Sequence, residues 1–310
     1  MNSKQPGSVH PVAGARILVT GGAGFVGSHV VDQLLDARAG KVVVVDNFIS
    51  GARANLARHA GDRRLRVIEA DVRNVEAMVA ATRGMDYAVH FASLPFDHSL
   101  ASPRECFEVM IDGFVNLLEA AVDARVKKLV IASCASVYGH PAYRPIDEDH
   151  PLRAEDAFAA AKIAAEEIGR AYHTMYGLGC VSLRYFRVYG SRMTARVWPE
   201  APGAAATSSS PDSLASADLV SVADAARAAI LALEAPFESR VFNIAAGTDG
   251  AIERARVDLG WKPNLTLAAG LDDLAAAVSA PLPPEGASAG QVAAAIANAS
   301  AGAEHDAATS

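Results

Sequence analysis

Short apolar runs alternate with longer segments of helical periodicity along most of the chain. The runs that predict buried β-strands cover 15–20, 41–46, 65–70, 87–91, 128–133, 180–186 and 240–244. The helical segments between and after them cover 25–37, 73–82, 103–124, 155–176, 222–234, 251–259 and 267–278. Strands that alternate with helices form a parallel sheet with helices on both faces. The pattern therefore predicts an α/β protein with a Rossmann-type, doubly wound parallel sheet.

The regular pattern breaks at both ends and after the sixth strand. We expect a flexible tail over 1–13 and a dinucleotide-binding Rossmann core over 14–190. From 191 to 280 we expect a core strand and helix interleaved with a small, shortened C-terminal substrate lobe. The linker-like stretch 200–218 and the segment 281–310 are rich in Ala, Ser, Pro and Gly, which predicts a loose connection and a disordered tail.

Composition narrows the possible partners. The 310-residue chain is 51% apolar and has a net charge of −7, with acids and bases interspersed. This distribution gives no basic field for nucleic acid or an anionic membrane surface. No apolar run reaches the roughly 18–20 residues of a membrane span, and the first residues lack a signal-peptide core. The three cysteines are far apart in the sequence and suggest neither a metal site nor a disulfide framework. We therefore expect a cytoplasmic protein that binds no metal, nucleic acid or membrane.

A glycine-rich turn joins the first predicted strand to the first helix. Residues 20–28 read TGGAGFVGS. Gly21 and Gly24 allow a tight turn that approaches a pyrophosphate, and Gly27 allows the helix to pack closely on the strand. A purely structural glycine turn is the alternative. The flanking strand and helix, together with an acid at the end of the second strand, favour binding of a nicotinamide dinucleotide.

The end of the second strand suggests how the adenosine half of that cofactor is held. Asp46 can accept hydrogen bonds from the ribose hydroxyls and favours NADH, because a 2′-phosphate would meet a like charge. Arg53 could turn in to offset that charge, or it is a solvated arginine at the start of a helix. Asp71 can meet the adenine amino group, cap the helix that follows it, or do both. The cofactor is therefore NADPH or NADH.

Several segments together resemble one enzyme family. They are 21–27 (GGAGFVG), 45–47 (VDN), 90–93 (HFAS), 116–120 (NLLEA), 136–139 (SVYG), 161–166 (AKIAAE) and 184–190 (RYFRVYG). The sequence resembles the extended short-chain dehydrogenase/reductases, especially the nucleotide-sugar epimerases and dehydratases, from about 16 to 190. The resemblance implies cofactor contacts at Gly21, Gly24, Phe25, Val26, Gly27, Asp46, Asn47, Phe48, Arg53, Asp71, Val72, Phe91, Ala92, Ser93, Lys162, Phe186 and Val188.

The catalytic positions depart from that family. Its members use an Asn, a Ser or Thr, a Tyr and a Lys; here the first three read Met110, Cys134 and Phe158. Lys162 remains, and the resemblance gives it the role of holding the nicotinamide ribose. The candidate catalytic residues are therefore Lys162, Ser136 and Ser93.

The substrate end departs as well. Arg187 stands where the family has an Asn, and Ser191 stands where it has a Pro. An Arg-Asp pair that grips a nucleotide diphosphate in the family reads Ala217-Asp218 here. The residues that would bind a sugar nucleotide are thus largely replaced, whereas the cofactor-binding motifs are intact.

Three functions are compatible with this combination. The first is a divergent nucleotide-sugar epimerase or dehydratase, and the second is a non-catalytic NAD(P)-binding or regulatory protein. The third is a ketoreductase that takes its proton from a phenol on the substrate. The combination is similar to atypical ketoreductases of angucyclinone polyketide pathways, the simocyclinone pathway among them. That resemblance implies an aromatic ketone substrate and a role in antibiotic biosynthesis. The family also implies homodimer contacts through 103–124 and 155–176, although a monomer stays open.

Overall fold

A seven-stranded parallel sheet forms the centre of the protein. The computed structural model describes residues 12–193, 218–236, 238–247 and 250–265. The strands are β1 (Arg16–Thr20), β2 (Lys41–Asp46), β3 (Leu65–Glu69), β4 (Tyr87–His90), β5 (Lys128–Cys134), β6 (Gly179–Tyr185) and β9 (Ser239–Ile244). They lie in the order β3-β2-β1-β4-β5-β6-β9, and each neighbouring pair is parallel. The predicted α/β fold class is confirmed. The strand order reverses between β1 and β4, where Rossmann proteins bind their ligands.

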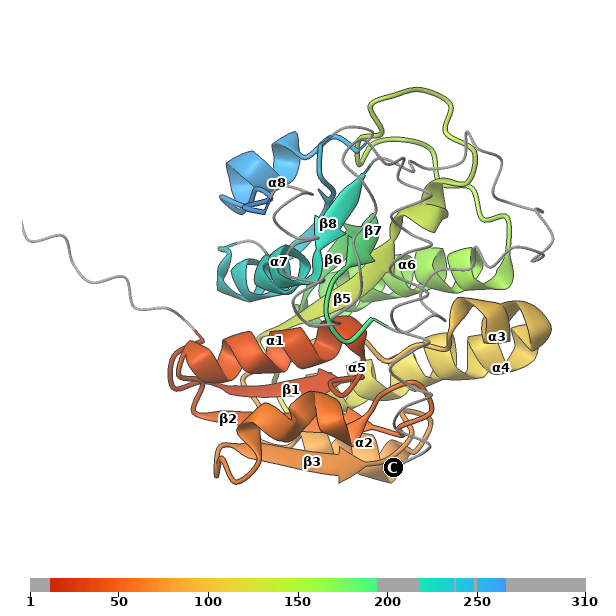
Figure 1. Cartoon of the computed structure of the whole chain (residues 1–310). Helices are drawn as coiled ribbons and strands as arrows, with labels where there is room; N and C mark the ends of the chain where they lie inside the picture. Colours follow the sequence, from red (N-terminus) through yellow and green to blue (C-terminus); the bar gives the residue numbers. More distant parts are fainter. Residues whose placement is uncertain (1–11, 194–217, 237, 248–249, 266–310) are drawn as a thin grey trace, which may run out of the picture.

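Helices cover both faces of the sheet. Helices α1 (Phe25–Asp36) and α7 (Val222–Glu234) lie on one face, and α2 (Val75–Thr82), α5 (Gly113–Asp123) and α6 (Ala157–Tyr176) lie on the other (Figure 1). Side chains alternate along β1 in the same way: Ile17 and Val19 join the α1–α7 core, and Leu18 joins the α2–α5–α6 core. The apolar runs of the sequence are therefore strands buried on two sides.

The predicted helix 103–124 is divided into three parts. It consists of α4 (Pro103–Phe107), one π-helical turn (η2, Glu108–Asp112) and α5. Gly113 follows this turn, and a Cβ atom there would lie 2.5 Å from Val72 Cγ2. The helix can therefore carry no side chain at this position. A single π turn shifts the register by one residue, and average periodicity cannot show this.

The segment between β4 and α4, to which the sequence pattern assigns neither strand nor helix, also contains a helix. The segment α3 (Phe96–Ala101) carries His98, whose Nε2 lies 2.9 Å from Glu105 Oε2. His98 therefore has a helical position and an acidic partner.

The edge strand β3 is less covered than the sequence pattern implies. Its side chains are largely exposed, and Val67 is 36% exposed. The short 3-10 helix η1 (Arg53–His59) lies beside it in place of a full α-helix. The expectation of complete cover on both faces was therefore wrong for this edge.

The C-terminal third is only partly described. Strands β7 (Arg187–Tyr189) and β8 (Leu219–Ser221), which the sequence did not predict, form a separate parallel pair, and α8 (Glu253–Asp258) follows β9. The predicted linker 200–218 falls outside the described residues except at its last position. The helix 267–278 and the tail 281–310 also fall outside them. The predicted tail 1–13 is described only at its end, where Val12 is fully buried in the core.

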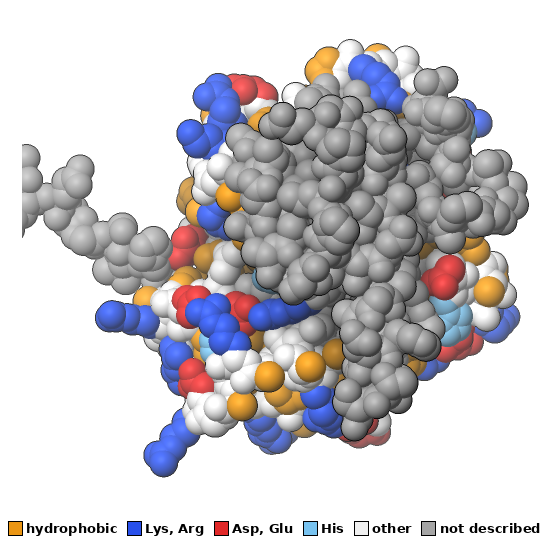
Figure 2. Space-filling view, in the orientation of Figure 1, with side chains coloured by type: hydrophobic (Ala, Val, Ile, Leu, Met, Phe, Trp, Pro, Cys, Tyr) orange, Lys and Arg blue, Asp and Glu red, His pale blue; other side chains and the backbone are white. Residues whose placement is uncertain are grey.

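Charged side chains are mixed in sign on the face of α1. Acidic and basic groups lie side by side there (Figure 2), and the ion pairs include Arg58–Asp36 and Arg192–Asp32. Within the described ranges, no helix is both long and apolar enough to cross a membrane.

Candidate cofactor and catalytic site

The glycine turn is held by close backbone contacts. Gly21 has a φ of +69°, and a Cβ atom there would lie 2.6 Å from Ala92 N. A Cβ atom on Gly27 would lie 2.2 Å from Gly21 O. Any larger residue at either position would push β1, α1 and the end of β4 apart. The two glycines therefore bring the start of α1 to the reversal point of the sheet.

The start of α1 is suited to an anion. In the described part of the chain, no side chain caps α1 and its first turn has no acid. By contrast, α2, α6 and α7 are capped by Asn74, Asp156 and Ser221. The first N–H groups of a helix need acceptors, and a phosphate can supply them. The backbone at Phe25 and Val26 therefore fits the pyrophosphate of a dinucleotide.

Asp46 joins the turn to the end of β2. Its Oδ2 accepts from Ala23 N at 2.9 Å and its Oδ1 accepts from Phe48 N at 2.9 Å. The side chain is only 7% exposed because the following loop folds over it. Each carboxylate oxygen has a further lone pair that can accept a ribose hydroxyl.

Asp71 lies next to the same loop. It accepts from Asn47 Nδ2 at 3.1 Å and receives two bonds of 2.9 Å from the Arg73 guanidinium. These bonds, those from Arg73 first, lower the pKa of Asp71 to about 2. Of the two roles considered for Asp71, the helix cap belongs to Asn74 instead, which caps α2 by accepting from Ala77 N. Asp71 instead keeps Asn47 in place beside Asp46.

Arg53 is the basic group at this end of the site. Its guanidinium carbon lies 4.3 Å from the centre of the Phe48 ring, and it forms an ion pair with Glu69. The arginine is therefore neither turned onto Asp46 nor left without a partner.

Lys162 lies under the carboxyl ends of β4 and β5. Its Nζ donates to Ala132 O at 2.7 Å, and the residue is 8% exposed. Burial lowers the pKa of Lys162, because the ammonium loses hydration. Nearby His90 is also buried, and its Nδ1 lies 2.7 Å from Thr20 Oγ1; burial, and then the charge of Lys162, lower the pKa of His90 to about 3. His90 is thus a neutral core residue.

Phe158 occupies the position for which the resemblance implies a tyrosine. It lies one helical turn before Lys162 on α6, and Lys162 Nζ is 5.3 Å from the centre of its ring. The Phe96 ring packs against it edge-on at 5.8 Å. Met110 is buried and accepts a weak bond from Cys106 Sγ at 3.5 Å. Two of the positions that carry polar groups in the family are therefore apolar here.

A thiol and two hydroxyl groups lie at or just after the carboxyl ends of β4 and β5. Cys134 ends β5, and its Sγ lies 2.6 Å from Ser136 Oγ in the short helix η3 (Ala135–Tyr138). Burial raises the pKa of Cys134, so the thiol is a poor acid and a weak nucleophile. Ser93 follows β4 and is partly buried; Phe91 and Ala92 precede it and pack on the two cores.

The structure places the remaining predicted contacts in the core. Val188 packs in the α1–α7 core, and Phe186 packs with Tyr138 in a smaller cluster. Asp218 is fully buried and accepts from Gly247 N at 2.9 Å and from Gly250 N at 2.6 Å. Asp218 therefore holds the loop after β9.

Sequence reasoning missed a buried ion pair behind the site. Arg184 donates to Glu166 through Nε at 3.0 Å and Nη2 at 2.7 Å, and it also donates to Tyr138 OH at 2.9 Å. Ser133 Oγ donates to the same glutamate. The spacing of Lys162 and Glu166, four residues apart, is the signal that places both on one face of α6.

The fold and these contacts are those of a Rossmann protein with a glycine-rich turn at the reversal of its sheet. Residues 17–245 match the family described as "NAD dependent epimerase/dehydratase family". The chain belongs to this family, which confirms the family resemblance and, at family level, the nicotinamide cofactor.

Individual relatives are sugar-nucleotide enzymes. A UDP-glucose 4-epimerase of Corynebacterium glutamicum is 31% identical over 261 residues, which are 77% of this chain and 78% of that protein. A UDP-glucose 4-epimerase of Lacticaseibacillus casei is 38% identical over 178 residues, 56% of this chain and 52% of that protein. The matched region spans only about half the length of several such relatives.

Solved structures agree with this assignment. The dTDP-glucose 4,6-dehydratase DesIV of Streptomyces venezuelae, with NAD and TYD bound, is 30% identical with a TM-score of 0.73; the match covers 84% of this chain and 95% of that chain. These relatives support an NAD-dependent epimerase/dehydratase and give no support to a polyketide substrate.

Proposed function

We propose that this protein is an NAD(P)H-dependent ketoreductase for an aromatic polyketide-type ketone, with a proton that comes from the substrate. The observation that supports the proposal is that phenylalanine, at position 158, stands where the family resemblance implies a tyrosine. A phenylalanine ring has no ionisable proton, so it cannot do the work of the tyrosine that the family resemblance implies. The ring nevertheless keeps its place beside Lys162 Nζ.

The polar groups described around Phe158 do not replace the tyrosine as an acid. Lys162 is buried and bonded to Ala132 O, an arrangement suited to holding the ribose of a bound cofactor. Ser136 can donate a hydrogen bond to a carbonyl, but an aliphatic hydroxyl does not release its proton near neutral pH. Because its pKa is raised, the Cys134 thiol is no better as a proton donor than the serine hydroxyl.

A phenol on the substrate meets the remaining need. When bound, the reduced nicotinamide supplies the hydride that adds to the ketone carbon. The ketone oxygen then takes the proton of a neighbouring phenol, whose pKa is about 10, and water reprotonates the phenolate. Ser136 and Ser93 orient the carbonyl, and the apolar Phe158 and Phe96 rings suit an aromatic skeleton better than a sugar.

The comparisons favour a second candidate, a divergent nucleotide-sugar epimerase or dehydratase. Its support is the sugar-nucleotide chemistry named for the relatives. Such a reaction needs a base that takes a hydroxyl proton as hydride leaves, and the loss of one costs roughly a hundred- to ten-thousandfold in rate.

The test is NADPH or NADH oxidation by the purified chain with a peri-hydroxy aromatic ketone, beside NMR of UDP-glucose and dTDP-glucose mixed with the chain and NAD⁺. Ketone-dependent oxidation with unchanged sugars is expected. Conversion of either sugar nucleotide without ketone reduction would replace the proposal with the second candidate. Cofactor binding with neither reaction would favour the non-catalytic alternative.

The cytoplasmic location and a homodimer through α5 and α6 stay predictions. Light scattering of the purified chain after size exclusion distinguishes a dimer from a monomer.

A further inference from the structure

A line of polar and charged side chains runs from the loop after β2 to helix α3. Asn47 donates to Asp71 at 3.1 Å, and Arg73 donates to the same carboxylate through Nε and Nη2, both at 2.9 Å. The remaining guanidinium nitrogen of Arg73, Nη1, lies 3.9 Å from Glu105 Oε1 on α4. The other carboxylate oxygen of Glu105 lies 2.9 Å from His98 Nε2 on α3. These contacts therefore connect the loops after β2 and β3 to α3.

The backbone at Arg73 is anchored to the core. Asn116 on α5 donates from Nδ2 to Val72 O and to Arg73 O, both at 3.2 Å. Val72 itself is buried and lies against Gly113 at the start of α5. The Arg73 side chain therefore extends toward Glu105 from a segment that α5 already holds.

Helix α3 depends on its neighbours for its position. It has six residues, and within the described parts of the chain no side chain caps its start. A helix this short is not stable on its own, so its contacts with the rest of the protein decide where it lies. Phe96 packs edge-on against Phe158 on α6, and His98, two residues later, bonds to Glu105 on α4. The bond at His98 therefore helps to fix the Phe96 ring.

We propose that Glu105 is a positioning residue for the ketone site. Its carboxylate joins Arg73 to His98 and so fixes α3 to the core. The bond to His98 keeps Phe96 packed on Phe158, so that the two rings form one wall for an aromatic substrate. The inference rests on the proposed ketone reduction and adds a residue that shapes the site without touching the reacting atoms.

Glu108 offers a matched control for Glu105. Its Oε2 lies 3.7 Å from the same Nη1 atom of Arg73, and its Oε1 lies 3.9 Å from Arg104. The two acids therefore share the contact with Arg73, but among the described contacts only that of Glu105 reaches His98. A change at Glu108 removes a similar negative charge and leaves the bond to α3 in place.

Reduction of 8-hydroxy-1-tetralone by NADPH and hydrogen exchange of the full chain test the inference. Glu105→Ala should raise the KM for the ketone by about threefold to tenfold, while kcat and NADPH affinity stay within about twofold. The amides of Ser99 and Ser102, which donate within α3 and at its end, should exchange faster by a similar factor.

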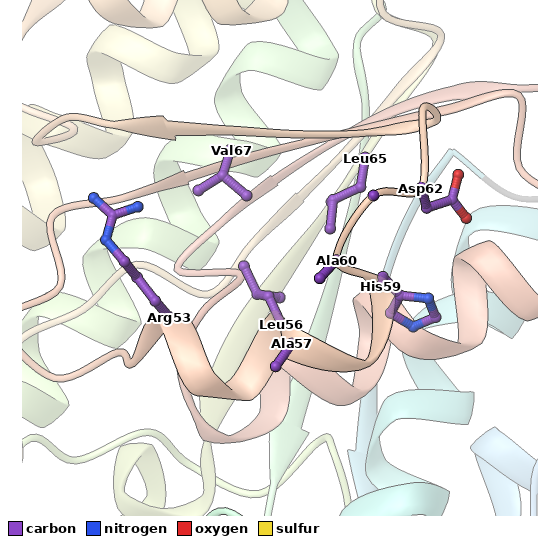
Figure 3. A pocket seen from close by; sticks show the side chains of 9 residues that line it. Arg53, Leu56, Ala57, His59, Ala60, Asp62, Leu65 and Val67 are labelled. Carbon is purple, nitrogen blue, oxygen red and sulfur yellow. The ribbon is translucent and has the colours of Figure 1, made fainter.

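Further variants separate positioning from a general loss of stability. Glu105→Gln keeps an amide that can bond to His98 and should stay within about twofold of wild type. Glu108→Ala should change neither KM nor exchange. In a His98→Ala background, Glu105→Ala should have no further effect, because its partner is already gone. Asp62→Ala is a distant control: Asp62 lies beside the pocket between η1 and β3 (Figure 3), before the amino end of β3, whereas α3 follows the carboxyl end of β4.

The outcomes separate this inference from the proposed function. If the ketone is reduced and Glu105→Ala leaves its KM unchanged, or Glu108→Ala raises KM equally, the inference is overturned and the proposed function stands. A fall in kcat or NADPH affinity without a rise in KM would also overturn it. If wild-type protein reduces no ketone, the proposed function fails. Faster exchange in α3 of Glu105→Ala would then still support the hold on this helix, and unchanged exchange would overturn it as well.

Discussion

Substitution of Gly27 by alanine should abolish tight cofactor binding while the chain still folds. The new Cβ atom would lie 2.2 Å from Gly21 O, well inside the 3.4 Å at which ordinary contact begins. The turn or α1 must therefore move by about 1 Å. The three nearest atoms, which belong to Gly21 and Gly22, are all backbone atoms, so no side-chain rotation relieves the contact.

The size of the effect follows from the bonds that this movement breaks. Overpacking of this kind costs about 1–3 kcal/mol of folding free energy. A shift of about 1 Å also misaligns the first N–H groups of α1 with a pyrophosphate. Each hydrogen bond to a charged group is worth about 1.5–3 kcal/mol, so the loss of one weakens binding roughly ten- to 150-fold, and the loss of two weakens it by about a hundredfold to ten-thousandfold.

Gly177→Ala is the matched control. Gly177 ends α6 with a φ of +71°, and a Cβ atom there would meet nothing within 4 Å. This change should cost about 1 kcal/mol from backbone strain alone and leave cofactor affinity intact. Urea unfolding and NADPH fluorescence titration measure both effects for each variant. Wild-type NADPH affinity in a folded Gly27→Ala protein would refute the role of the turn.

Three further predictions concern the ionised residues of the site. Glu166→Gln should lower the free energy of unfolding by about 3–5 kcal/mol, because Arg184 is left buried without its carboxylate; a loss in urea below about 1 kcal/mol would contradict this. Asp71 has a pKa of about 2, below its ordinary value, so its stabilisation is present above about pH 4 and is lost as the pH falls through 2. Asp71→Asn should therefore reduce the difference in urea stability between pH 7 and pH 3, by under about 1 kcal/mol for this partly exposed group; an unchanged difference counts against the pairing with Arg73. Lys162→Met should keep or raise the urea midpoint, since it removes a buried ammonium, yet lower kcat/KM for ketone reduction; an unchanged kcat/KM would rule out a role for the lysine.

Much of the fold could be predicted because strands buried on both faces are continuous apolar runs. The helix 222–234 and the strand 41–46 have the predicted bounds. The π turn before Gly113 could not be predicted. It lies beside the close approach of Gly113 to Val72, a residue that is far away in the sequence. Strands β7 and β8 are three residues long and leave almost no periodic signal.

The site divides in a similar way. The glycine turn is local and could be predicted, because the backbone geometry of Gly21 and Gly27 depends on their immediate neighbours. The burial of Asp46 and the pairing of Arg53 with Glu69 depend on how the loop after β2 folds. The conformation of that loop cannot be predicted from the periodicity of the sequence. The absence of an acid at Phe158 is plain in the sequence, but only the structure shows that Phe96 packs against it.

The most direct test of a substrate-derived proton compares two ketones that differ in one hydroxyl, 8-hydroxy-1-tetralone and 1-tetralone. NADPH oxidation is followed for both with wild-type protein and with Phe158→Tyr. The hydroxylated ketone should be reduced about a hundredfold or more faster by the wild type, and the tyrosine should speed only the ketone that lacks the hydroxyl. Equal rates for the two ketones with wild-type protein, or a large gain for the hydroxylated ketone with Phe158→Tyr, would contradict the account.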